Sequence, residues 1–213
     1  YVTVPAEREI TIKMLLNHTS GLTYGGGKLT EYYKKAGVAG WAPRDRGTIG
    51  DMVRKLAPLP LNHQPGEKWE YGLSQDVLGY FIEVVSVMSL DRFFRERIFS
   101  PLGMNDTFFF PPKEKLSRIP PNYTMTAKGT IELVKNLQSN ITQDRGTYFS
   151  GGAGLYSTAS DYARFAQMLL NDGELDDVRI LSRKTVELMT TDSTGGIVIL
   201  GGTGDTQATH GDR

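Results

Sequence analysis

The sequence predicts a mainly helical α+β domain, and three observations carry that prediction. Apolar residues recur at helical spacing in three stretches, which follow Ser74, begin at Leu90 and follow Ser160. Strand signals are short and lie between turn residues, at 122–134 and 174–181. The chain has 213 residues, of which 39% are hydrophobic and 23% charged, and this composition is ordinary for a globular protein with a substantial core.

The composition excludes several classes of function. Lysine plus arginine and aspartate plus glutamate number 24 each, so the charge balance favours neither nucleic acid nor an anionic membrane surface as a partner. The absence of cysteine excludes disulfides, thiolate metal sites and a cysteine nucleophile. Three histidines lie far apart without helical spacing, so we expect no metal and no cofactor. We also expect no membrane-spanning segment and no signal peptide, and Tyr1 in place of Met indicates a piece of a longer protein.

Two short helices are expected in the first sixty residues. Thr11 can cap the first, and Gly21 suits the left-handed backbone beyond its end. Thr48 begins the second, with an acidic residue in its first turn. Their expected apolar residues are Ile12, Leu15 and Leu16 in the first helix, and Met52 and Leu56 in the second. Between the two helices, the glycine-rich stretch 23–47 is expected to be a surface loop, where Trp41 could pack.

The stretch from Pro65 to Ser74 organises the rest of the chain. Pro65 and Gly66 give a turn signal, and Trp69 and Tyr71 point the same way if the segment is extended. Ser74 can then cap a helix with an apolar face of Val77, Leu78, Phe81, Ile82 and Val85. A tyrosine held between a turn and a helix is a candidate catalytic group, although spacing alone favours an ordinary half-buried aromatic residue.

The second half of the chain predicts more helices and two hairpins. Ser89 is the expected cap of a helix over 90–99, and Ser160 and Ser182 are the expected caps of two later helices. One hairpin is predicted to turn at Lys128-Gly129 and the other at Asp176-Asp177. The glycine-rich segment 151–158 lets the backbone approach a ligand or another segment closely. We expect the helices after Ser74, Leu90 and Ser160 to share one core, with Gly151 near Tyr71.

His18 titrates near neutrality and could act as a general base. No Gly-x-Ser-x-Gly elbow surrounds any serine, so the usual Ser-His hydrolase arrangement has no support. We therefore interpret His18 as a structural residue that bonds the loop.

Three blocks in this order resemble the serine β-lactamase and penicillin-binding-protein-like hydrolases, especially the esterase branch called family VIII. The first is ITIKMLLNHTSGL at 10–22, and the third is GGAGLYSTASDYARF at 151–165. The second lies at 65–79 and combines a Pro-Gly turn, Trp-x-Tyr and the helix start Asp-Val-Leu-Gly. The resemblance implies that residues 1–194 are the helical and connecting part of a β-lactamase/transpeptidase-like fold, with flanking sheet strands missing, and that 195–213 is a glycine-rich tail.

The resemblance also implies which catalytic parts are absent. The family nucleophile is the serine of a Ser-x-x-Lys motif, and no serine in this chain has lysine three residues later. We expect that motif upstream of Tyr1 and a third motif after Met189, for which His210-Gly211-Asp212 is a poor match.

By the same resemblance, Tyr71 is the expected catalytic base, acting with the absent lysine. Trp69, Gly72, Leu73 and Gly152 are the expected substrate-binding residues. Gly72 and Leu73 stand where most β-lactamases have serine and asparagine after this tyrosine, and this departure favours an ester or short acyl substrate over a β-lactam.

The function expected for an intact parent is hydrolysis of carboxylic esters or β-lactams through an acyl-enzyme. A D,D-peptidase of the penicillin-binding-protein type and a catalytically inactive helical scaffold remain as alternatives. The expected partner is a small-molecule ester or β-lactam, and the 213 residues alone are expected to be inactive.

Overall fold

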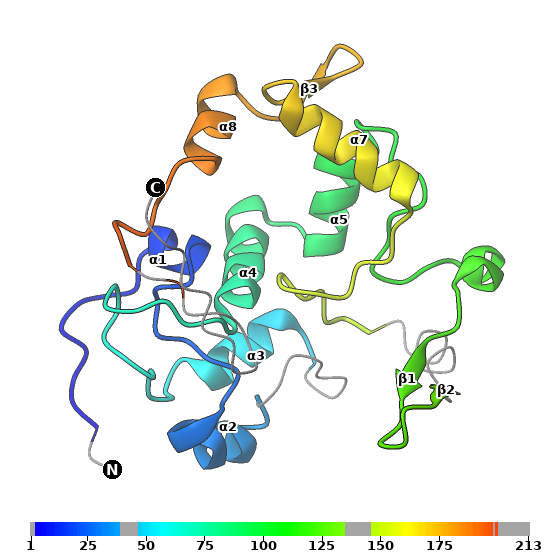
Figure 1. Cartoon of the computed structure of the whole chain (residues 1–213). Coiled ribbons are helices and arrows are strands. Elements are labelled where there is room, and N and C mark those ends of the chain that lie inside the picture. Colours follow the sequence, from blue (N-terminus) through cyan, green and yellow to red (C-terminus); the bar gives the residue numbers. More distant parts are fainter. Residues whose placement is uncertain (1–2, 39–46, 135–145, 198, 200–213) are drawn as a thin grey trace.

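The computed structural model describes residues 3–38, 47–134, 146–197 and 199. Within them the structure is the predicted mainly helical α+β fold (Figure 1). The α-helices are α1 (Ile12–Leu16), α2 (Thr30–Ala36), α3 (Ile49–Leu56), α4 (Ser74–Ser86), α5 (Leu90–Phe94), α7 (Ala159–Leu170) and α8 (Arg183–Met189). The other helical turns are the 3₁₀ helices η1 (Gly27–Leu29) and η3 (Lys113–Arg118) and the π-helical turn η2 (Arg95–Phe99). The strands are β1 (Tyr123–Met125), β2 (Ile131–Leu133), β3 (Glu174–Leu175) and β4 (Val178–Arg179). Trp41 and His210–Asp212 lie outside the described residues.

Helix α4 lies in the middle of the molecule (Figure 1). Helices α1, α2 and α3 gather on one side of it, and α5, α7 and the β3–β4 hairpin lie on the other. In the described part of the chain, no helix is long and apolar enough to cross a membrane.

The expectation of one shared core is wrong, because most of the buried apolar residues fall into two clusters, and Leu90, Phe109 and Val186 are buried outside both. The first cluster is formed by helices α1, α2, α3 and α4 and the segments between them. It contains Leu15, Leu22, Leu29, Tyr33, Val38, Ile49, Met52, Leu56, Leu73 and Leu78. The second joins α5, η2 and α7 and contains Phe99, Leu102, Met104 and Met168. Val87 explains the division, because its left-handed backbone (φ 55°) ends α4 and redirects the chain before α5 begins.

Side-chain caps begin four of the helices. Thr11, Thr48 and Ser182 accept hydrogen bonds from backbone N–H groups in the first turn, as predicted. The predictions for Ser74 and Ser160 are wrong. Leu73 precedes α4 without the extended backbone of a capping residue, and the Ser74 hydroxyl instead bonds the Ser20 hydroxyl at 2.8 Å. The cap of α7 is Thr158, two residues before Ser160. Ser89 stands at the start of α5, but its hydroxyl donates to Asp91 and caps no backbone group.

Thr48→Ala is expected to lower the free energy of unfolding by about 1 kcal/mol, the usual cost of losing a helix cap. The Thr48 hydroxyl accepts from Asp51 N, and the Asp51 carboxylate accepts from Thr48 N, so the change breaks a reciprocal pair. Urea unfolding measures the effect. Ser89→Ala is the control, because Ser89 makes no capping bond. Equal losses in the two variants would contradict the prediction.

The helices bury narrower faces than their patterns predict. Leu15 on α1, Leu78 on α4 and Val186 on α8 are buried, whereas expected neighbours on the same faces lie at the surface. The exposed residues include Ile12, Leu16, Phe81, Val85, Leu188 and Met189. These three helices therefore bury a narrower face than the sequence pattern predicts.

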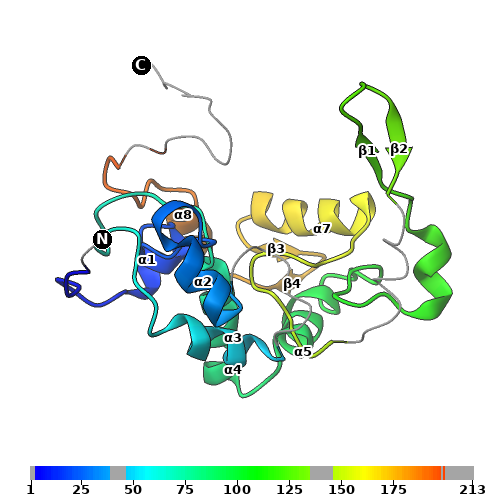
Figure 2. The ribbon, with the colours of Figure 1, turned by 90° about the horizontal axis from the view of Figure 1, so that it is seen from below.

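Both predicted hairpins are confirmed. Strands β1 and β2 pair antiparallel at the periphery of the molecule, with every residue exposed (Figure 2). Strands β3 and β4 are joined by Asp176 and Asp177, whose positive φ angles of 49° and 62° fit the tight turn of a two-residue hairpin.

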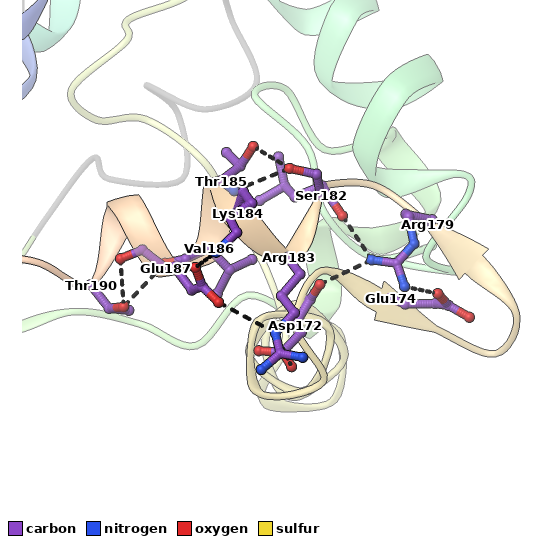
Figure 3. A network of polar contacts seen from close by, with 11 residues as sticks. Asp172, Glu174, Arg179, Ser182, Arg183, Lys184, Thr185, Val186, Glu187 and Thr190 are labelled. Atoms are coloured by element: carbon purple, nitrogen blue, oxygen red, sulfur yellow. Dashed lines mark hydrogen bonds and ion pairs between the residues drawn. The ribbon is translucent and has the colours of Figure 1, made fainter.

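A polar network ties the β3–β4 hairpin to the chain that follows α7 and precedes α8 (Figure 3). Arg179 pairs with Glu174 and donates to the backbone oxygens of Asp172 (3.0 Å) and Leu181 (3.1 Å). Arg183 lies 3.7 Å from the Asp172 carboxylate at the end of α7. An exposed ion pair by itself contributes little to the free energy of unfolding. The hydrogen bonds from Arg179 to backbone oxygens are therefore the main contacts that hold the hairpin in this network.

Candidate active site

Two backbone hydrogen bonds fix the segment 65–73, which carries Tyr71 and leads into α4. This segment is called the Tyr71 link. Gly66 N donates to Thr19 O at 2.7 Å, and Glu70 N donates to His18 O at 2.8 Å. Gly66 has φ 84°, a value that favours glycine. The Pro-Gly turn and the first resemblance block therefore lie side by side, and Tyr71 is held between that pairing and the start of α4.

Three aromatic rings surround Tyr71. Trp69 stacks on it with centroids 6.1 Å apart and an interplanar angle of 16°, as their spacing predicts. The Tyr24 ring meets it edge-on at 5.6 Å, and the His18 ring lies 5.0 Å away. Tyr71 is still 45% exposed, so the residue is packed on its sides yet reachable from solvent.

Tyr24 is a site residue that the sequence did not reveal, although it lies two positions beyond the first resemblance block. Burial, and then the neighbouring Tyr71 and the Asp76 carboxylate, raise the pKa of Tyr24 to about 12. Tyr24 therefore keeps its proton near neutral pH and can donate a hydrogen bond beside Tyr71.

His18 holds the segments on both sides of Tyr71. Its backbone oxygen accepts from Glu70 N, and its Nε2 lies 3.2 Å from the Gln75 amide nitrogen in the first turn of α4. Its Nδ1 is buried and has no hydrogen-bond partner among the described residues. Burial lowers the pKa of His18, so its ring is neutral at pH 7. These contacts agree with a structural residue that bonds the loop.

The free energy of unfolding is expected to fall as the pH drops below about 6.5, because unfolded His18 binds a proton more readily than folded His18 does. The contribution is complete above the unfolded pKa and is lost as the pH falls through the lowered folded pKa. Urea unfolding at several pH values measures the slope.

The His18→Asn variant serves as the comparison for this slope. Asparagine tolerates the positive φ of 58° and does not titrate. The pH dependence should be shallower in the variant, and an identical slope would exclude His18 as its source.

Gly72 and Leu73 both lie against the protein interior. A Cβ on Gly72 would come within 2.5 Å of Leu22 O and Thr23 Cα, so only glycine fits this backbone. Leu73 is 1% exposed and belongs to the first core cluster. The expectation that Leu73 contacts substrate is therefore wrong for this structure, because its side chain fills the core.

The glycine-rich segment packs on the first turn of α4, beside the Tyr71 link. A Cβ on Gly151 would lie 2.0 Å from Gln75 O, and one on Gly152 would lie 3.3 Å from the Asp76 carboxylate. The segment therefore lies against the helix that directly follows Tyr71 in the chain. Gly152 is exposed there, as a contact with substrate requires.

Among the described residues, no group of acidic and histidine side chains could hold a metal ion. The site consists instead of tyrosine hydroxyls, an aromatic wall and a close-packed glycine segment.

Comparison with known proteins identifies the family. A family model described as Beta-lactamase matches residues 1–205, and the chain belongs to that family. An uncharacterized protein of Mycobacterium tuberculosis is 36% identical over 193 residues, which is 89% of this chain and 46% of that protein. Lovastatin esterase of Penicillium rubens is 32% identical over 180 residues, which is 80% of this chain and 42% of the esterase.

A solved structure agrees with these matches. EstCE1, described as a hydrolase with promiscuous acyltransferase activity, superposes with a TM-score of 0.71 at 27% identity. The match covers 84% of this chain and 49% of EstCE1. The chain therefore spans about half the length of the relatives that it matches.

Proposed function

We propose that the protein hydrolyses carboxylic esters through a covalent serine ester, with Tyr71 transferring the proton. The observation that carries this proposal is the placement of Tyr71, a half-exposed phenol packed by Trp69 and Tyr24 on a link fixed at both ends. A rigidly held group of this kind keeps its hydroxyl in one position relative to a bound substrate.

The proton transfer requires a second group. A free phenol has a pKa of about 10, so Tyr71 becomes a useful base near neutral pH only beside a positive charge. The chain contains no Ser-x-x-Lys motif. We therefore assign the nucleophilic serine and the lysine ammonium to residues outside these 213. Tyr71 would remove the serine proton and later protonate the leaving group.

Esters are favoured over β-lactams by the two residues after Tyr71. Gly72 has no room for any side chain, and the Leu73 side chain points into the core. Neither position offers a polar side chain that could hold the acylamino group of a lactam. The named activity of lovastatin esterase, a relative at 32% identity, supports the same direction.

The test uses enzyme expressed from the complete coding sequence. It should hydrolyse a short p-nitrophenyl ester with a burst of nitrophenol, and a fluorophosphonate probe should label a serine. The 213 residues alone should do neither. Turnover of nitrocefin or of a D-Ala-D-Ala peptide without ester turnover would overturn the proposal in favour of a β-lactamase or a D,D-peptidase.

A further inference from the structure

The carboxylate of Asp76 lies in the first turn of α4 and is almost completely buried, with 3% of the residue exposed. Its Oδ1 accepts hydrogen bonds from the Ser150 hydroxyl at 2.6 Å and from the Tyr148 hydroxyl at 3.1 Å. Burying a carboxylate is costly unless donors compensate it. Both donors come from the chain just before the glycine-rich segment, so the compensation depends on that segment being in place.

Ser150 connects the Asp76 carboxylate to the backbone of the residues that follow it. While its hydroxyl donates to Asp76, its oxygen accepts from Gly152 N and Ala153 N, each at 3.1 Å. One side chain thus orients two successive N–H groups, and the conformation of residues 150–153 is tied to the carboxylate. We call residues 150–153 the glycine wall.

The glycine wall cannot shift toward α4, because contact is already close. Gly151 packs on Gln75 O, and the position of a Cβ on Gly152 is 3.3 Å from the Asp76 carboxylate. The Tyr71 link ends where this helix begins, so the wall and Tyr71 share one support.

A second buried carboxylate, that of Asp161, also accepts hydrogen bonds from a separate loop of the chain. Asp161 in α7 is 7% exposed, and its Oδ2 accepts from Asp106 N at 2.7 Å and from the Thr107 hydroxyl at 2.8 Å. It fastens the loop that follows Met104, a residue of the second core cluster. Asp161 therefore provides a matched control for Asp76.

We propose that Asp76 is a positioning residue that fastens the glycine wall beside Tyr71 and so sets which acyl groups the site accepts. Asp76 touches neither substrate nor the reacting atoms; it acts through Ser150 and the backbone of Gly152 and Ala153. The part of the proposal that concerns acyl groups rests on the proposed esterase function.

The first test is amide hydrogen exchange, which needs no activity. In Asp76→Asn the exchange rates of the Gly152 and Ala153 amides should rise by about tenfold, because the charge that holds Ser150 is gone. The Asp106 amide should not respond. In Asp161→Asn the pattern should reverse, with faster exchange at Asp106 alone. Unchanged exchange at Gly152 and Ala153 in Asp76→Asn would overturn the proposal.

The second test is acyl selectivity in the enzyme from the complete coding sequence. The ratio of kcat/KM for p-nitrophenyl acetate to that for p-nitrophenyl octanoate should change by about fivefold or more in Asp76→Asn, but by less than about twofold in Asp161→Asn. Ser150→Ala, which leaves the carboxylate in place, should reproduce the Asp76→Asn change. If the ratio of the two kcat/KM values changed equally in the Asp76 and Asp161 variants, Asp76 would have no specific effect on acyl selectivity, and the proposal would be overturned. A wild-type enzyme without ester turnover would reject the esterase function and leave the exchange result to decide the positioning role.

Discussion

Tyr71→Phe is expected to lower kcat for ester hydrolysis by about a hundredfold or more in the enzyme from the complete coding sequence. The change keeps the ring that stacks on Trp69 and meets Tyr24, and it removes only the hydroxyl. The free energy of unfolding should change by only about 1 kcal/mol, the value of one hydrogen bond. The loss should therefore appear in turnover and not in folding.

Both quantities are measured on the same purified variant, by steady-state kinetics and urea unfolding. Tyr32→Phe is the matched control, because Tyr32 on α2 is 49% exposed, close to the 45% of Tyr71. A folded Tyr71→Phe enzyme with kcat near that of wild type would remove Tyr71 from the proton transfer.

Gly151→Ala is expected to cost about 3 kcal/mol or more of unfolding free energy, which is the range of severe packing defects. The new Cβ would lie 2.0 Å from Gln75 O and 3.0 Å from Gly79 N. Both are backbone atoms of α4, so the clash cannot be relieved by a side-chain rotation. The glycine wall must move away from the helix or the helix must distort.

Gly26→Ala provides the comparison, since Gly26 has φ −84° and no atom within 4 Å of the position of its Cβ. Its stability should equal or slightly exceed that of wild type, because alanine restricts the unfolded chain. Urea midpoints measure both variants. A Gly151→Ala protein as stable as Gly26→Ala would mean that the wall is not packed on α4 as described.

Local signals were the most predictable part of this fold. Thr48 begins α3 as predicted, with Asp51 in its first turn, and Asp176-Asp177 makes the expected hairpin turn. These features depend on residues within a few positions of each other, so the sequence pattern contains all the partners. The three resemblance blocks also indicated the family.

Features that depend on distant partners were predicted less well. Ser74 had the right residue type for a cap, but the Ser20 hydroxyl, 54 positions earlier, occupies it. Leu73 was expected to contact substrate because of its place after the tyrosine in the resembled motif, yet its side chain belongs to the first core cluster. Tyr24 contacts Tyr71, and Asp76 contacts Tyr148 and Ser150, only after separate segments of the chain pack together. No local sequence pattern indicates these long-range contacts.

The division of the core into two clusters has a consequence for the order of folding. The buried residues of the first cluster all lie between Leu15 and Leu78, and those of the second between Phe99 and Met168. Each cluster can thus begin to form from its own stretch of chain. The bonds from Tyr148 and Ser150 to Asp76 join positions more than seventy residues apart, so they close a long loop. Contacts of this separation form late, since the entropy of loop closure must be overcome before they contribute. The glycine wall should then be among the last parts to assemble, and the first to open when the protein begins to unfold.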